Sequence, residues 1–191
     1  MEILENAKNA LESLQYKMVS KDVLKTAEVG ELDAIDLLVA QHREVDALFA
    51  AYQEAGESAF RTKEKIYETI AAKLRLHAEL EETHFYPAAA RVIADQVREG
   101  EEEHAVFKDL LDKIDELAAE DETFDAKVTV LRELVHHHVG EEERDLFPVC
   151  KSKLSSERLK ELGSIMHAQT LREDEELKDA KTKAAAQDQA H

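Results

Sequence analysis

Apolar residues recur at steps of three and four positions along four segments of the chain, the spacing that collects them on one face of an α-helix. We therefore expect four amphipathic helices that bury those faces against one another. Their expected extents are Glu31 to about Gly56, 66 to 86 with a continuation past a kink at Pro87 to Gly100, about Glu101 to Ala118, and 128 to 149.

Further helices are predicted at both ends of the chain. The N-terminal one could dock on the bundle or across a homodimer interface, and the pattern does not decide between them. At the other end, Ser155-Ser156 marks a helix start, and the last residues have little to bury. The predicted organisation is a helical extension over 1–30, a bundle domain over 31–154, a helix over 155–177 and a flexible tail over 178–191.

Composition supports an all-α fold in a single main domain. Of the 191 residues, 43% are hydrophobic, which is enough for a real core, whereas only 5 are glycine and 2 are proline. Glycine and proline form the turns and corners that sheets require, and strong helix formers dominate this chain instead.

Charge and targeting signals narrow the class of protein. Lys and Arg number 25 against 43 Asp and Glu, a formal net charge of −18. Such a surface repels phosphate backbones and anionic lipids, so we expect no nucleic-acid and no membrane partner. The N-terminus lacks the features of a signal peptide, and no apolar run approaches the ~18 residues of a membrane span. These features predict a cytoplasmic protein. The single cysteine, Cys150, is expected to be a small packed residue.

Histidines and glutamates interrupt the apolar stripes of the four main helices. Burying imidazole or carboxylate groups costs several kcal/mol unless they are paired or coordinate an ion. One such residue carries little weight, but six on four inner faces predict a metal site. The six candidate ligands are His42, His77, Glu81, His104, His138 and Glu142.

An internal repeat strengthens this interpretation. The segments 77–87 and 138–148 both read His-x-x-x-Glu-Glu, then three residues, an aromatic residue and proline, at a constant offset of 61. Residues four apart differ by about 40° around a helix, so His and Glu stack on one face about 6 Å apart. The repeat predicts two helical hairpins that each contribute ligands to one site. His137 and Glu141 have the same spacing, but the proline register and the apolar stripe select His138 and Glu142.

The donor set indicates the kind of metal. A structural zinc ion is saturated by four donors and usually recruits cysteine, whereas calcium and magnesium prefer oxygen. Four imidazoles and two carboxylates suit iron best, with manganese second and zinc less favoured.

At these residues the sequence resembles the hemerythrin-like, or HHE cation-binding, family over about 31–150. The resemblance implies an antiparallel up-down-up-down four-helix bundle that holds two non-haem iron ions. By that match the four histidines would be terminal ligands. Glu81 and Glu142 would bridge the irons together with an oxo or hydroxo group. Oxygen-carrying hemerythrins have a further histidine where this chain has Lys108, a departure that disfavours clean oxygen carriage.

Several neighbouring residues have open roles. His84 could fill the position that Lys108 leaves without an imidazole, or it could support a ligand from outside the site. Glu82 and Glu143 point about 100° away from the preceding ligands and are expected either to support neighbouring helices or to orient ligand histidines. Asp145 is expected to pair with Arg144 or with a lysine. Tyr52 and Tyr86 are expected in the core or at its rim. His167 and His191 are expected in solvent.

Three functions remain in competition. The first is a di-iron protein that binds O2 or peroxide and acts as a sensor, buffer or scavenger. The second is an oxidoreductase, either a ferroxidase or a catalase-like enzyme, for which Glu81-x-x-His84 has the spacing found in ferritin-like sites. The third is a metal-free acidic helical interaction module. The sequence leaves enzymatic turnover undecided.

Overall fold

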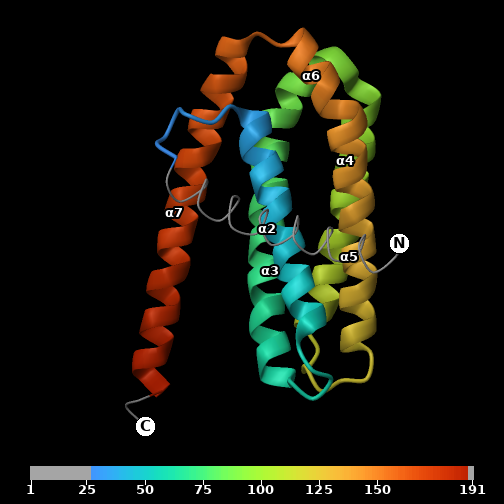
Figure 1. Ribbon diagram of the computed structural model, residues 1–191, viewed down its shortest axis with the longest axis vertical. Coiled ribbons are helices and arrows are strands. Elements are labelled where there is room, and N and C mark those ends of the chain that lie inside the picture. The colour runs from blue at the N-terminus through green and yellow to red at the C-terminus, as the bar shows by residue number, and fades with distance from the viewer. Residues whose placement is uncertain (1–26, 189–191) are drawn as a thin grey trace, which may run out of the picture.

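The computed structural model describes residues 27–188, with side chains described as far as Glu176, and all regular structure in this range is helical (Figure 1). The elements are α2 (Ala34–Glu54), α3 (Phe60–Leu80), η1 (Glu81–Phe85), α4 (Tyr86–Asp115), α5 (Phe124–Glu141), η2 (Glu142–Leu146), α6 (Phe147–Lys153) and α7 (Ser156–Asp188). The all-α prediction is confirmed. The helix predicted at the N-terminus lies almost wholly outside the described residues.

Two antiparallel hairpins form the bundle, as Figure 1 shows. Helices α2 and α3 form the first hairpin, the second half of α4 and α5 form the other, and α7 runs alongside α2 and α3. Helix α2 begins cleanly because the Asp33 side chain accepts a hydrogen bond from the backbone N–H of Asp36 at 3.0 Å, which satisfies one of the free donors at a helix start. The expected four-helix bundle is thus confirmed.

A π-helical turn begins at each of the two candidate glutamates. The segments η1 and η2 begin at Glu81 and Glu142, and in each the N–H five residues later, of Tyr86 or Phe147, bonds the glutamate carbonyl. Proline comes next in both cases, and its ring clashes with the carbonyl four residues earlier in a regular α-helix. The wider turn relieves that clash, so the chain continues as a helix rather than ending.

The second and third bundle helices meet at Ile93, not at Gly100. Ile93 has φ −154° and ψ 65°, far from helical values, and separates two helical pieces within α4. The expectation of a second helix that continues to Gly100 is therefore wrong, and the third begins just after Ile93. The π turn accommodates the proline without a break in the helix, and the chain reverses direction at Ile93, six residues after Pro87.

Two apolar clusters lie on either side of a polar layer in the bundle. One cluster includes Leu38, Phe85 and Phe147, and the other includes Phe49, Phe107 and Leu131. The six candidate ligands are buried in the layer between them. Apolar walls on both sides exclude water and strengthen electrostatic interactions in that layer.

Helix α7 is longer than predicted and closely packed at its start. It continues to Asp188, beyond the expected end at 177. A Cβ added to Gly163 would lie 2.3 Å from the carbonyl oxygen of Leu32, so only glycine permits this approach to the segment before α2. His167 is 1% exposed, which corrects the expectation that it lies in solvent. None of the described helices is both long and apolar enough to cross a membrane.

Candidate metal centre

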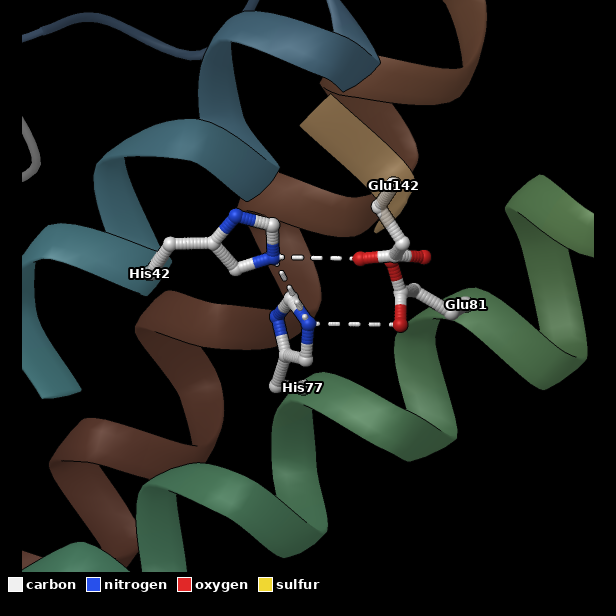
Figure 2. Close-up of side chains that lie close together, drawn as sticks. All are labelled: His42, His77, Glu81 and Glu142. Carbon is white, nitrogen blue, oxygen red and sulfur yellow. Dashed lines mark hydrogen bonds and ion pairs between the residues drawn. The ribbon is translucent and has the colours of Figure 1, made fainter. Parts of the chain in front are cut away.

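The six candidate ligands converge at mid-bundle, each at most 4% exposed. Donor atoms of His42, His77, Glu81 and Glu142 form one compact group, and those of Glu81, His104 and His138 form a second (Figure 2 shows the first). Within each group the atoms lie within 4.8 Å of one another. Glu81 belongs to both groups.

The two histidine pairs are spanned by both carboxylates. The Nε2 atoms of His42 and His77 are 3.2 Å apart, and those of His104 and His138 are 3.1 Å apart. The carboxylates join the two pairs. Glu81 Oε2 lies 3.2 Å from Nε2 of both His77 and His104. Glu142 Oε2 lies 3.3 Å from Nε2 of His42 and 3.5 Å from Nε2 of His138. Each glutamate therefore contacts one histidine of each pair.

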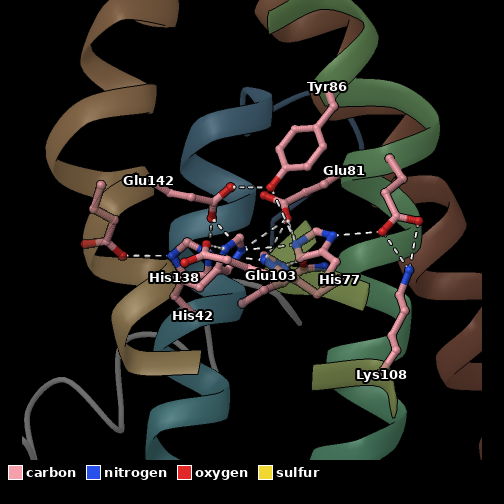
Figure 3. Close-up of polar contacts among 12 residues, drawn as sticks. His42, His77, Glu81, Tyr86, Glu103, Lys108, His138 and Glu142 are labelled. Carbon is pink, nitrogen blue, oxygen red and sulfur yellow. Dashed lines mark hydrogen bonds and ion pairs between the residues drawn. The ribbon is translucent and has the colours of Figure 1, made fainter. Parts of the chain in front are cut away.

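Every candidate histidine turns Nε2 inward and Nδ1 toward an acceptor on a neighbouring helix. Figure 3 shows the polar contacts around this layer, with Tyr86 above the clustered side chains and Lys108 to one side. The four Nδ1 contacts are His42 to Glu143 at 2.8 Å, His77 to Gln41 at 2.9 Å, His104 to Glu82 at 2.9 Å and His138 to Glu103 at 2.8 Å. Acceptors in this position fix the imidazole tautomer and orientation, as they do around metal-ligating histidines.

Sequence reasoning found two of these four acceptors. Glu82 and Glu143 directly follow the candidate glutamates, and of their two expected roles the contact with a candidate histidine is observed for both. Gln41 and Glu103 were missed, although each directly precedes a candidate histidine and they occupy equivalent places in the repeat. Their position before a ligand was the available signal. The two differ in chemistry, because Gln41 is neutral and its amide also donates to Thr170 Oγ1 at 3.2 Å.

Burial and neighbouring polar groups shift the pKa values of several side chains in the layer. Burial acts to lower the pKa of His42, but Glu142 and Glu143 outweigh it and raise that pKa from 6.5 to about 9. Burial dominates at His77 and lowers its pKa. For Glu81, burial acts to raise the pKa, but His77 and His104 hold it well below the usual range. The neighbouring imidazoles thus stabilise the ionised form of Glu81, a role that a bound cation also performs for a buried carboxylate.

Carboxylate oxygens provide the test of whether this layer fits a metal. Both Glu81 oxygens and Oε2 of Glu142 are buried and make no hydrogen bond of normal geometry with the described residues, although imidazole Nε2 atoms lie 3.2 to 3.5 Å from the Oε2 atoms. Buried polar atoms are normally paired, and ionised ones nearly always are. Four inward-facing Nε2 atoms lie around these oxygens, so the donor set fits ions that accept mixed nitrogen and oxygen ligands.

Tyr86 lies between the ligand layer and a small cavity. Its hydroxyl donates to Glu142 Oε1 at 3.0 Å, and its ring stacks on His104 with centroids 5.4 Å apart. A cavity of about 70 Å³ extends from Tyr86, His138 and Glu142 past Glu103 and Glu141. Tyr86 thus fixes one carboxylate and forms part of the wall beside it.

Other candidates lie outside the layer. His84 contacts Gln169 Oε1 of α7 at 3.0 Å and does not join the clustered donors. Lys108 turns outward and pairs with Glu82 at 2.6 Å. Asp145 pairs with Arg144, as expected. His137 is exposed, in agreement with the selection of His138 for the layer.

Comparison with known proteins identifies the family. The profile of the hemerythrin HHE cation binding domain matches residues 33–150, which is more than half of the chain. The chain belongs to this family. With its buried cluster of histidines and glutamates, it is a metal-binding, hemerythrin-like helical protein.

Two individual proteins resemble the chain. A crystal structure of a hemerythrin HHE cation binding domain-containing protein from Mycobacterium kansasii has a TM-score of 0.67 and 21% identity, over 74% of this chain and 87% of that one. At that identity the likeness shows the fold alone. A protein named DNA nickase from Nostoc sp. is 26% identical over 141 residues, which are 73% of this chain and 40% of that protein. This chain therefore spans about two fifths of that relative's length.

Proposed function

We propose that the chain holds two iron ions and binds or reacts with O2 or peroxide as a sensor, buffer or scavenger. One ion would be held by His42 and His77 and the other by His104 and His138. The observation that carries the proposal is that Glu81 and Glu142 each contact one histidine of both pairs. Two shared carboxylates suit a pair of ions better than a single one.

The chain's own residues prepare this layer for redox chemistry. The two apolar clusters exclude water, and the acceptors on Nδ1 keep each Nε2 directed inward. The Tyr86 hydroxyl donates a hydrogen bond to Glu142 and holds that carboxylate in place. Two bound irons would supply electrons and open positions for an oxygen species.

Lys108 favours reaction over reversible carriage. It stands where oxygen carriers have an additional histidine, and its ammonium group binds Glu82 instead of facing inward. Glu82 in turn accepts from His104. The second ion would therefore have one imidazole fewer in its shell, which leaves more room for oxygen species or water.

An oxidoreductase is the second candidate, either a ferroxidase or a catalase-like enzyme. The observation that favours it is the cavity beside Glu142, whose wall includes the carboxylates of Glu99, Glu141 and Asp145 and would attract cations. Oxygen evolution from peroxide should then be faster for the iron-loaded wild type than for Glu142→Ala. Equal rates in the two proteins would eliminate catalase-like turnover at this site.

The DNA nickase name of the Nostoc relative is not extended to this chain. A net charge of −18 repels a phosphate backbone, and the chain spans only part of that relative. A cytoplasmic location and a homodimer through the N-terminal helix stay predictions from the sequence.

Iron loading tests the proposal. Metal-free protein given Fe²⁺ without air and then exposed to air should gain about two irons per chain and charge-transfer absorption in the near ultraviolet. Glu81→Gln should lose both features. Glu68→Gln is the matched control, because Glu68 is exposed on the same helix and loses the same charge. A wild-type protein that stays colourless and retains no iron would support the metal-free interaction module instead.

A further inference from the structure

A second group of metal-type donors lies at the surface beside the ligand layer. It consists of His137 and Glu141, one turn apart on α5, and Glu103 on α4, with donor atoms within 4.8 Å of one another. His137 Nε2 lies 3.6 Å from Glu103 Oε1 and 3.5 Å from Glu141 Oε1. His137 is exposed and the two glutamates are half-buried, so the group is open to solvent. The pair His137/Glu141 repeats the spacing of His138/Glu142 but faces outward.

This outer group shares a cavity with the buried layer. Glu103 and Glu141 line the cavity of about 70 Å³ whose inner wall includes His138 and Glu142. At that inner wall, Oε2 of Glu142 is buried and lies 3.3 Å from Nε2 of His42 and 3.5 Å from Nε2 of His138, without a hydrogen bond of normal geometry among the described residues. The cavity therefore connects the outer group with a carboxylate oxygen of the candidate donor set.

Glu103 connects the two groups through one carboxylate. Its Oε2 accepts from Nδ1 of His138 at 2.8 Å, while its Oε1 is the oxygen nearest to His137. A cation held by Glu103 Oε1 would therefore be separated from the buried layer by a single side chain and a single imidazole.

The charged side chains around the cavity favour the binding of cations, but with low affinity. Glu99 and Asp145 add two further carboxylates to its wall. Arg144 competes for the same groups, because its guanidinium lies 3.8 Å from Glu141 and 2.6 Å from Asp145. Three donors near solvent, with a cation alongside, predict weak and rapidly exchanging binding.

We propose that Glu103, His137 and Glu141 form an outer docking site for a divalent transition-metal ion, through which ions reach the buried layer. The mixed nitrogen and oxygen donors suit Fe²⁺ or Mn²⁺. The proposal deepens the proposed function and rests on it for the destination of the ion, but not for the outer site itself. Glu103 has a positioning role as well, because it holds His138.

Loading kinetics test the route. Metal-free protein is mixed with Fe²⁺ without air, and at successive times a ferrous chelator removes ions that are not yet buried. His137→Ala and Glu141→Gln should slow the loading by about tenfold, the lower end of the effects that local charge has on ion capture, while the final iron content equals that of wild type. His136→Ala is the matched control, since His136 is the adjacent exposed imidazole and pairs with Asp46 instead; it should load at the wild-type rate.

Equilibrium binding of Mn²⁺ tests the outer site independently. Electron paramagnetic resonance counts free Mn²⁺, and wild type should show one weak site that both outer variants lose and His136→Ala keeps. Variants that load at the wild-type rate and keep the weak site would overturn the docking site. If no protein retains buried metal but the weak site still depends on His137, the proposed function fails and the outer site stands.

Discussion

Gln41 accepts the Nδ1 proton of His77 at 2.9 Å with its side-chain amide oxygen. The amide nitrogen of the same side chain donates to Thr170 on α7 at 3.2 Å, and Thr170 donates to the carbonyl of Met166. One side chain thus links a candidate ligand to a helix that lies beyond the family-matched region of 33–150. The orientation of His77 depends on how α7 packs.

The Gln41 contact predicts an effect on metal affinity. Gln41→Ala removes the acceptor, so the His77 ring loses its fixed orientation, and metal affinity should fall about 10- to 100-fold. Gln41→Glu should retain most of the affinity, because the equivalent position in the repeat, Glu103, holds His138 with a carboxylate. Competition with a chelator measures both. Equal affinity for Gln41→Ala and wild type would show that the contact does not matter for binding.

Alanine substitutions at two helix glycines should change the free energy of unfolding in opposite directions. Gly163→Ala places a Cβ 2.3 Å from the carbonyl oxygen of Leu32, so α7 must shift and the free energy of unfolding should fall by about 1–3 kcal/mol. Gly140→Ala meets nothing within 4 Å and should gain up to about 1 kcal/mol from helix propensity. Urea unfolding of the two variants checks the signs. A stabilising Gly163→Ala would mean that the close approach to α7 is absent in solution.

Tyr86 should influence metal affinity through Glu142. Tyr86→Phe leaves Glu142 Oε1 without its donor, which should cost about 1–3 kcal/mol of stability and lower metal affinity about tenfold. Gly100→Ala should act in the same direction, because its Cβ would lie 2.6 Å from the Tyr86 hydroxyl oxygen. Calorimetry with and without metal measures both effects.

The control for Tyr86 is another buried tyrosine far from the layer. The Tyr67 hydroxyl donates to Asp115 at 2.7 Å and lies 3.0 Å from the carbonyl oxygen of Leu111. Tyr67→Phe should therefore lower stability without a change in metal affinity. If it lowered metal affinity as much as Tyr86→Phe does, the effect of Tyr86 would be one of general stability.

The ion pair between Lys63 and Asp125 predicts that the stability of the fold depends on pH. Lys63 is buried and its ammonium group donates to Asp125 at 2.6 Å. Burial acts to raise the pKa of Asp125, but the hydrogen bonds from Lys63 and Tyr52 lower it overall. A carboxyl group with a lower pKa when folded contributes stability above its unfolded pKa of about 4, and that contribution is lost as the pH falls below this value.

The corresponding experiment compares wild type with Asp125→Asn. At pH 7 the variant should be less stable by about 1 kcal/mol, a modest figure because Asp125 is more than half exposed. The difference should shrink as the pH falls from 4 toward 2, since protonation removes the same charge in the wild type. A difference that stays constant over that range would exclude the pair as its cause.

The fold and the candidate ligands were largely predictable because both repeat along the chain. Apolar residues spaced three and four positions apart predict the helices, and the offset of 61 between His77 and His138 identifies equivalent positions in the repeat. Glu82 and Glu143 could be placed because a helix fixes the direction of the next residue. These are local rules, and they hold within one helix without knowledge of its neighbours.

The remaining features depend on what packs beside each helix. Gln41 and Glu103 act on histidines of other helices, so their partners appear only once the bundle is assembled. His167 looks like a surface residue in its own sequence context, yet the first half of α7 packs on α2 and buries it. The reversal at Ile93 has no proline or glycine to mark it. Each of these is a tertiary effect that overrides a local pattern.

The central claim is that two ions share Glu81 and Glu142, and the metal content of single variants tests it most directly. Native mass spectrometry of iron-loaded protein should give two irons per wild-type chain. Glu81→Gln should lose both ions together, because that carboxylate contacts a histidine of each pair. One iron per wild-type chain, or a Glu81→Gln variant that still holds two, would contradict a site built around a shared carboxylate.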